Sequence, residues 1–313
     1  MLYRPLGQTG LNVSILGMGT WPLGGGVSID NQAYGYGDLS EQNAEAAVAA
    51  ARVGGVTLFD TADFYGLGRS EEVLGRVLAG DKNAIIVTKA GYDTDGRAPP
   101  KQQFDKTYLV SALEQSLSRL QRDVVDIFML HTIPDTPEKW DQAKAALLEI
   151  TRQGLAHHTG VSVAHRMDVG CELVEDDTVA VIEMYFNPLN ASFQDALSTK
   201  CRDLGIGVLA ASPFCRGLLT PDFDPHRVYG DDDVRRGWAN NRDKFDADLV
   251  ERSDVAKRAA AAGLDIAAFS LSQIWNDQTV SSVIPGMRNE RHVADNLARA
   301  AAFEAEVMGA INS

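Results

Sequence analysis

The feature that most constrains the fold of this chain is the repeated alternation of short apolar runs with longer amphipathic segments. Runs with strand character recur eight times over the 313 residues, with helix-like segments between them. Runs such as Ala84-Ile85-Ile86-Val87 are apolar at every position, which indicates strands covered on both faces, as in a parallel sheet. The expected strands are 15–19, 56–60, 84–89, 126–131, 156–161, 179–184, 206–210 and 281–284.

Eight strands alternating with helices, without a tandem repeat, predict an α/β fold, a closed (β/α)8 or TIM barrel that forms a single domain over residues 1–313. A short hairpin around Gly7-Gln8-Thr9-Gly10 is expected to precede the barrel. The main alternative is a doubly wound open sheet. It is disfavoured because the early glycines, from Gly17 to Gly26, do not form the G-x-G-x-x-G motif that leads from a strand into a helix.

Several residues are typical of helix ends. Ser70 is expected to cap a helix that Gly80 ends, and Thr136, followed by proline, is expected to cap another. Ser192 is a candidate cap for the segment that ends near residue 204. Residues 211–245 are expected to form one long irregular loop, and a loop of that length inside a compact domain is usually functional.

Composition narrows the class of protein. A formal net charge of −14 argues against general binding to nucleic acid or to an anionic membrane surface, but it leaves room for a local basic pocket. The three cysteines, Cys171, Cys201 and Cys215, form no C-x-x-C pair, which predicts reduced thiols, a cytoplasmic protein and no metal site. No apolar run approaches the length needed to span a membrane.

Four titratable side chains are expected at one end of the barrel. Asp60, Lys89 and His131 stand at the carboxyl ends of the second, third and fourth expected strands, and Tyr65 lies in the loop after the second. In a (β/α)8 barrel these ends face the active site. Each residue alone has an ordinary structural explanation, but their shared position indicates a catalytic group.

These four groups suit proton transfer to a carbonyl oxygen. A lysine beside a tyrosine stabilises the phenolate and lowers the tyrosine pKa, and an aspartate holds the lysine in place. The tyrosine can then donate its proton, while a histidine orients the substrate oxygen. None of these side chains donates electrons, so a hydride must come from a cofactor, most simply a nicotinamide.

Six short motifs surround these residues and extend over nearly the whole chain: Phe59-Asp60-Thr61-Ala62-Asp63-Phe64-Tyr65-Gly66, Val87-Thr88-Lys89, Leu130-His131, Gly160-Val161-Ser162, Ser212-Pro213 with Gly217-Leu218-Leu219, and Ile284-Pro285-Gly286. In sequence and in order they resemble the motifs of the aldo-keto reductases, particularly the bacterial aldo-keto reductases and sugar dehydrogenases. The resemblance implies a (β/α)8 barrel with an N-terminal hairpin and NAD(P)(H)-dependent chemistry. It also implies a catalytic tetrad of Asp60, Tyr65, Lys89 and His131, in which Tyr65 donates the proton.

The resemblance also implies a cofactor site. Arg288 is expected to pair with a 2′-phosphate, which favours NADP(H) over the alternative NAD(H). Three positions depart from the family pattern: Val163 replaces an asparagine, Glu183 a glutamine, and Ala211 the aromatic residue that stacks on the nicotinamide. The implied cofactor-binding residues are Gly19, Thr20, Asp60, Ser162, Glu183, Ser212, Phe214, Arg216, Leu218, Gly286, Arg288, His292, Asp295 and Asn296.

The expected function is NADP(H)-dependent interconversion of an aldehyde, ketone or aldose with the corresponding alcohol. Trp21, Tyr65 and His131 are expected to contact this small substrate. One alternative is an NAD-dependent aldose 1-dehydrogenase that works in the oxidative direction. Another is suggested by members of the family that serve as auxiliary subunits of membrane channels and bind NADP(H) with little turnover.

Overall fold

Eight parallel strands form one closed sheet in the computed structural model, which describes residues 1–93, 99–164, 166–190 and 194–311. The first and last strands meet, since Leu16 pairs with Val283 and Gly19 with Gly286. This closure confirms the predicted barrel and excludes the open sheet. Around the barrel the strands are β3 (Met18–Gly19), β6 (Leu58–Asp60), β7 (Ile85–Ala90), β10 (Val125–Leu130), β11 (Ala156–Ala164), β12 (Val181–Tyr185), β13 (Gly207–Ala211) and β14 (Ser282–Ile284).

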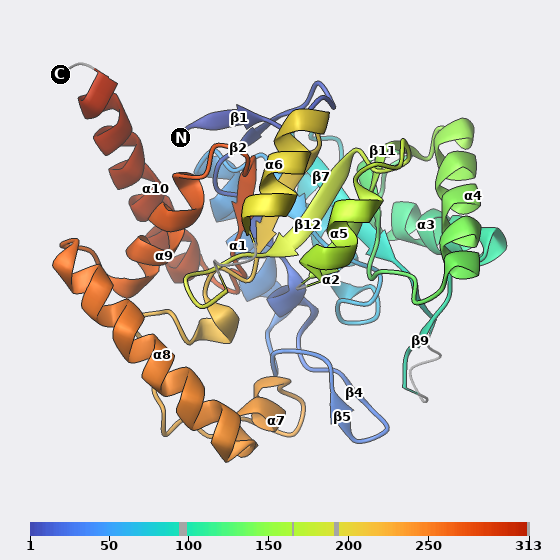
Figure 1. Cartoon of the computed structure of the whole chain (residues 1–313). Helices are drawn as coiled ribbons and strands as arrows, with labels where there is room; N and C mark the ends of the chain where they lie inside the picture. The colour runs from blue at the N-terminus through green and yellow to red at the C-terminus, as the bar shows by residue number, and fades with distance from the viewer. Residues whose placement is uncertain (94–98, 165, 191–193, 312–313) are drawn as a thin grey trace.

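Helices surround the sheet (Figure 1), and their apolar side chains form the main core against its outer side. Several of these helices begin directly after a residue whose side chain caps the first turn. The Thr136 hydroxyl accepts a hydrogen bond from the Lys139 N–H at 3.3 Å, as predicted. The surrounding helices are α1 (Glu41–Val53), α2 (Arg69–Leu78), α3 (Lys106–Leu120), α4 (Pro137–Gln153), α5 (Met167–Leu173), α6 (Gln194–Leu204), α9 (Ile266–Trp275) and α10 (Glu290–Ile311).

The prediction that Ser70 caps α2 is wrong. The helix begins at Arg69, two residues earlier than predicted, after Gly68, whose φ of 97° is accessible to glycine at little cost. The Ser70 hydroxyl is buried and instead donates to Thr20 Oγ1 at 2.7 Å, which ties α2 to the loop after β3. Gly80 does follow the end of this helix, with a φ of 76°. Ser192 lies outside the described residues.

Alternation along the strands determines which side chains enter the barrel. Ile85 and Val87 pack in the interior cluster, whereas Ile86 and Ala90 pack in the outer core. Lys89 continues the inward series and is completely buried. The hairpin of β1 (Tyr3–Pro5) and β2 (Asn12–Ser14) contributes Leu6 and Val13 to the interior cluster, which closes the amino end of the barrel.

The opposite, carboxyl end carries further elements, among them β4 (Ser28–Ile29), β5 (Gln32–Ala33), β8 (Tyr92–Asp93), β9 (Lys101–Gln102), α7 (Arg235–Asn240) and α8 (Arg242–Ala261). Residues 211–245 are therefore less irregular than predicted, since they contain α7 and the start of α8. The β4–β5 hairpin and α7 lie together at this end (Figure 1), and Val234 N–H donates to the Gly35 carbonyl at 2.8 Å. Within the described ranges, no helix is long and apolar enough to cross a membrane.

Candidate active site

The four predicted catalytic residues lie together at the carboxyl end of the barrel. Lys89 Nζ donates to Asp60 Oδ1 at 2.5 Å and lies 3.4 Å from the Tyr65 hydroxyl. The rings of Tyr65 and His131 meet edge to face, with their centroids 5.3 Å apart. The ends of β6, β7 and β10 position these side chains, so the site is built on the rigid sheet.

Lys89 is a permanently charged centre of this group. Its ammonium donates to the Thr61 carbonyl at 3.0 Å and lies 3.1 Å from Glu183 Oε2, in addition to its bond with Asp60. Burial by itself would lower the pKa of Lys89, but the two carboxylates raise that pKa well above its ordinary value. Lys89 is thus a fixed positive charge beside the Tyr65 hydroxyl.

Tyr65 is a neutral phenol in this environment. Burial raises the pKa of Tyr65 well above its ordinary value, and the Asp60 and Glu183 carboxylates add to this effect. Lys89 acts in the opposite direction, as expected from the sequence, but it does not outweigh the other three influences. The net direction is therefore opposite to the predicted lowering. A protonated Tyr65 at neutral pH is the form that a proton donor requires.

His131 is also neutral. Burial, together with the nearby Lys89 charge, lowers the pKa of His131 to about 3. Its Nδ1 atom is buried and has no hydrogen-bond partner among the described residues. A polar atom of this kind beside Tyr65 suits a ligand oxygen or an ordered water.

Glu183 also belongs to this cluster, although the sequence predicted it only as a contact for the cofactor carboxamide. It accepts a hydrogen bond from the Ser162 hydroxyl at 2.9 Å while its other oxygen faces Lys89. Burial and the Glu183 charge raise the pKa of Asp60, against the lowering effect of Lys89. Strand alternation could have predicted this position of Glu183. Val181 packs inside the barrel, and Glu183, two residues later on the same strand, points to the same side.

Aromatic rings pack around Tyr65 and His131. The Trp21 ring stacks on Tyr65 with centroids 5.9 Å apart, and Tyr36 lies edge-on to Trp21 at 4.9 Å. Phe64 and Tyr92 lie 6.4 and 5.5 Å from the His131 ring. Only Trp21 was anticipated from the sequence, since the approach of Tyr36 and Tyr92 to this site depends on tertiary contacts. Such walls suit a small substrate with an apolar or ring-shaped body.

The predicted cofactor residues near β3 and β14 have structural partners of their own. Thr20 Oγ1 donates to the Asp60 carbonyl at 2.7 Å, and Gly19 N–H donates to the Pro285 carbonyl at 3.0 Å. Gly286 pairs with Gly19, and its lack of a side chain leaves room for Pro22, which a Cβ would approach to 2.8 Å. These contacts close the barrel next to Asp60.

Arg288 is engaged with the backbone near the β4–β5 hairpin. Its guanidinium donates to the Tyr36 carbonyl at 3.1 Å and to the Asp38 carbonyl at 2.5 Å. The other three predicted adenosine contacts lie on α10. His292 is half-buried, Asp295 is exposed, and Asn296 is buried and accepts a hydrogen bond from Arg299.

The predicted phosphate loop after β13 has an unusual backbone. Ser212, Cys215 and Arg216 have φ angles of 55°, 45° and 59°, a region that non-glycine residues seldom occupy. Arg216 is exposed, whereas Phe214 packs against the main core and Leu218 is buried, with its N–H donating to the Cys215 carbonyl. Strain of this kind is common where a backbone is shaped for a ligand.

Arginines gather at this side of the mouth, although the chain is acidic overall. Burial raises the pKa of Tyr36, and the nearby charges of Arg235 and Arg216 act against this increase. The pKa of Arg288 is lowered by burial and by the charges of two neighbouring arginines. Arg235 is already paired with Asp233, whose carboxylate lies 2.6 Å from its guanidinium. Arg216 and Arg288 form no ion pair among the described residues, so these two side chains fit the phosphates of a dinucleotide.

Asp63, which lies close to the catalytic group, gives a prediction for stability. Burial and the neighbouring Glu71 carboxylate raise the pKa of Asp63 to about 8, and its Oδ1 has no partner within the described part of the chain. Between about pH 4 and pH 8 the folded state therefore holds a proton that the unfolded state releases, so this residue makes stability fall as pH rises. Asp63→Asn is expected to increase stability by about 1–3 kcal/mol at pH 8 to 9.

Urea unfolding at pH 5 and pH 8.5 tests this prediction, with the exposed Asp123→Asn as the matched control. The gain from Asp63→Asn should be larger at the higher pH. An equal or smaller gain there would contradict the assigned protonation state.

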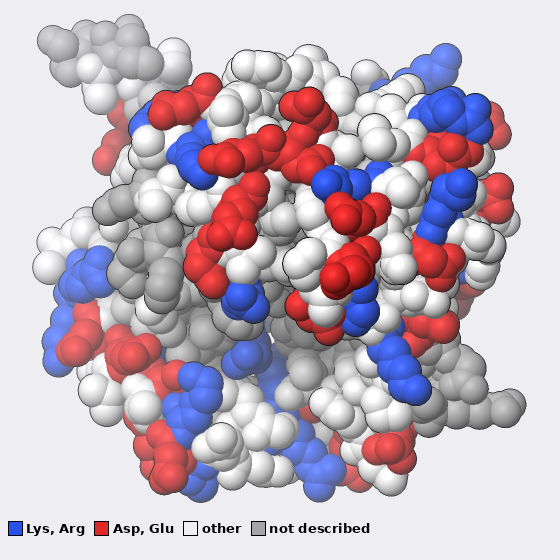
Figure 2. All heavy atoms as spheres, turned by 45° about the vertical axis from the view of Figure 1, so that its right-hand side comes forward, with Lys and Arg blue, Asp and Glu red and all other residues white. Residues whose placement is uncertain are grey.

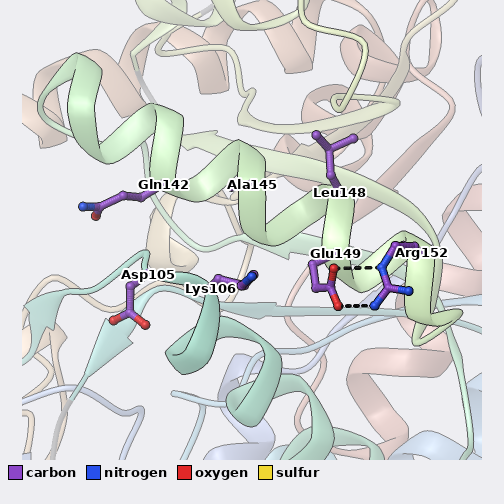
Figure 3. Close-up of a pocket in the computed structure, with 7 residues that line it drawn as sticks. All are labelled: Asp105, Lys106, Gln142, Ala145, Leu148, Glu149 and Arg152. Atoms are coloured by element: carbon purple, nitrogen blue, oxygen red, sulfur yellow. Dashed lines mark hydrogen bonds and ion pairs between the residues drawn. The ribbon is translucent and has the colours of Figure 1, made fainter.

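A hollow of about 320 Å³ lies between the start of α3 and the outer face of α4, and its Glu149 and Arg152 side chains pair with each other (Figure 3). Figure 2 shows acidic and basic side chains interspersed over one face of the molecule. Neither feature brings together the proton-carrying groups found at the barrel mouth.

The closed barrel and the buried proton-carrying group at its mouth define a (β/α)8-barrel oxidoreductase. The model of the Aldo/keto reductase family matches residues 15–313, and the chain therefore belongs to this family of oxidoreductases, which act on small carbonyl compounds.

Relatives of known description span nearly the whole chain. The L-glyceraldehyde 3-phosphate reductase of Escherichia coli O157:H7 is 27% identical over 95% of this chain and 87% of its own length. A probable voltage-gated potassium channel subunit beta of Oryza sativa subsp. japonica is also 27% identical, over 95% of this chain and 90% of its own length. The holo-form structure of the Bacillus halodurans aldo-keto reductase AKR11C1 has a TM-score of 0.76 at 23% identity, covering 96% of this chain and 90% of that one.

Proposed function

We propose that this protein is an NADP(H)-dependent reductase that interconverts an aldehyde, ketone or aldose with the corresponding alcohol, acting on the CH–OH group. The observation that carries the proposal is the Tyr65 hydroxyl, held 3.4 Å from Lys89 Nζ and beside the His131 ring. A neutral phenol next to a fixed cation is suited to give a proton to an oxygen that gains negative charge.

In reduction, Tyr65 donates its proton to the carbonyl oxygen, and Lys89 stabilises the phenolate that remains. Asp60 holds Lys89 in place at 2.5 Å, and the neutral His131 donates a hydrogen bond to the substrate oxygen. A bound nicotinamide would exchange the hydride, with Ser162, Glu183, Arg216 and Arg288 among the residues that hold the cofactor. In oxidation, the Tyr65 phenolate accepts the alcohol proton.

The direct test is consumption of NADPH with a reactive aldehyde such as 4-nitrobenzaldehyde, followed by a panel of aldehydes, ketones and aldoses with both cofactors in both directions. The aromatic walls around Tyr65 favour the ring-bearing aldehyde as a first probe. Tight NADPH binding without turnover on any member of the panel would contradict the proposal.

Arg288 is the residue proposed to select NADP(H). Arg288→Ala is expected to raise the dissociation constant of NADPH by about 10- to 100-fold, the scale of a lost charge-assisted hydrogen bond, and that of NADH by less than about threefold. Fluorescence titration measures both constants, with the exposed Arg152→Ala on α4 as the control. Equal losses for the two cofactors would rule out pairing with the 2′-phosphate.

Two other functions remain as alternatives. The channel-subunit name of the rice relative is consistent with an NADP(H)-binding auxiliary protein with little turnover. The engagement of Arg288 by the Tyr36 and Asp38 carbonyls favours an NAD-dependent aldose 1-dehydrogenase, which needs no phosphate partner. The substrate panel and the two titrations separate both from the proposed reductase.

We also propose a cytoplasmic location. The three cysteines are free thiols, and burial raises the pKa of both Cys201 and Cys215, so neither is a ready nucleophile. Thiols kept reduced are typical of that compartment.

A further inference from the structure

The buried cluster around Lys89 holds more negative than positive charge. Lys89 Nζ lies 2.5 Å from Asp60 and 3.1 Å from Glu183, and the three side chains are 0%, 4% and 5% exposed. Among the described residues, neither carboxylate forms an ion pair with a second cation. One ammonium therefore serves two buried acids.

The surrounding groups do not restore the balance. Tyr65 and Tyr185 are neutral because burial raises the pKa of each phenol, and His131 is neutral because burial lowers its pKa to about 3. Ser162 contributes only a hydroxyl dipole. With both acids ionised, the cluster has a net charge of −1, and a buried charge of this kind is costly unless a proton or a cation offsets it. The raised pKa of Asp60 reflects this cost, since a proton on Asp60 is one possible offset and a cation beside the cluster is the other.

The excess charge lies next to the point of hydride exchange. Lys89 contacts both Glu183 and Tyr65, so the Glu183 carboxylate is two short polar contacts away from the hydroxyl that protonates the substrate. Under the proposed function, the hydride reaches the carbon bonded to that same oxygen. The nicotinamide ring must therefore lie close to this cluster, and only its oxidised form carries a positive charge.

We infer that Glu183 makes the site selective for the oxidised cofactor, so that the resting protein holds the form that can accept a hydride from the carbon of an alcohol or sugar. This inference rests on the proposed function. The carboxylate attracts the cationic ring of the oxidised cofactor and gains nothing from the neutral ring of the reduced form. A neutral amide at the same position would lack this preference.

The test compares dissociation constants of the oxidised and reduced forms within each cofactor pair, NADP⁺ with NADPH and NAD⁺ with NADH, by fluorescence titration. The phosphates are identical within a pair, so the ratio of the two constants reports on the charge of the ring. The unmodified protein is expected to bind the oxidised form more tightly. Glu183→Gln should shift the ratio by about tenfold or more toward the reduced form, the order of one partly screened charge contact.

Two controls isolate the charge. Glu183→Asp keeps the carboxylate and should keep a preference for the oxidised form, whereas the exposed Glu114→Gln on α3 should leave the ratio unchanged. If Glu183 had only a structural role, its substitution would weaken the binding of both cofactor forms equally and leave the ratio of the two dissociation constants unchanged.

The outcomes are distinct. If the protein binds neither pair, the proposed function fails. If it binds both forms but Glu183→Gln leaves their ratio unchanged, the proposed function stands and this inference is overturned. If Glu183→Gln fails to fold, titration of the unmodified protein still tests the inference, because tighter binding of the reduced form than of the oxidised form would overturn it.

Discussion

Replacing Tyr65 with phenylalanine is expected to lower turnover by about 10²- to 10⁴-fold in both directions, the usual contribution of a positioned proton donor. The substitution removes the hydroxyl that lies 3.4 Å from Lys89 Nζ but keeps the ring that stacks on Trp21. The walls of the site should therefore persist, and the dissociation constants of the cofactor should stay within about threefold, since no cofactor contact is assigned to that hydroxyl.

Steady-state kinetics with 4-nitrobenzaldehyde and titration with NADPH measure the two effects separately. Tyr3→Phe provides a matched control, because Tyr3 is 45% exposed and lies on β1, in the hairpin that closes the amino end of the barrel. Turnover that survives Tyr65→Phe would remove this residue from its proposed role. A parallel loss of cofactor binding would instead indicate a collapsed site.

Lys89→Met is expected to abolish measurable turnover and to lower the free energy of unfolding by about 3–5 kcal/mol, the usual penalty for removing one partner of a buried ion pair. The reason is that Asp60 and Glu183 would then face each other in the barrel without a cation. Methionine nearly matches the length of the lysine side chain, so most of the loss should come from charge.

Urea unfolding of the variant, beside the exposed Lys82→Met, measures the stability change. The double variant Lys89→Met/Glu183→Gln tests the cause, because removal of one carboxylate should recover part of the lost stability without restoring turnover. Equal stability of the single and double variants would mean that the two acids do not compete for Lys89.

Much of the catalytic group could be predicted because it depends on local pattern. The series Ile85, Val87 and Lys89 alternates along one strand, and alternation by itself aims Lys89 into the barrel once the two neighbours are apolar. Asp60 and His131 follow from the same rule applied to adjacent strands. The direction of the Tyr65 pKa could not be predicted, because it results from competing burial and charges that only the folded structure brings together.

Contacts across the barrel could not be predicted from the local sequence pattern. Glu183 stands on β12, three places along the sheet from β7, and its 3.1 Å approach to Lys89 depends on how the sheet closes and staggers. Arg288 shows the same limit, since its partners at Tyr36 and Asp38 belong to a loop about 250 positions earlier in the chain. Ser70 has a cap-like sequence context, yet its hydroxyl bonds to Thr20.

The sequence by itself thus determined the barrel, the order of its strands and the side chains that end them, because strand periodicity and helix alternation are properties of neighbouring residues. Only the tertiary structure decided that one lysine would be shared by two carboxylates, and which loops would cover the mouth. Those features depend on barrel closure and on contacts between distant segments, which no stretch of the chain encodes alone.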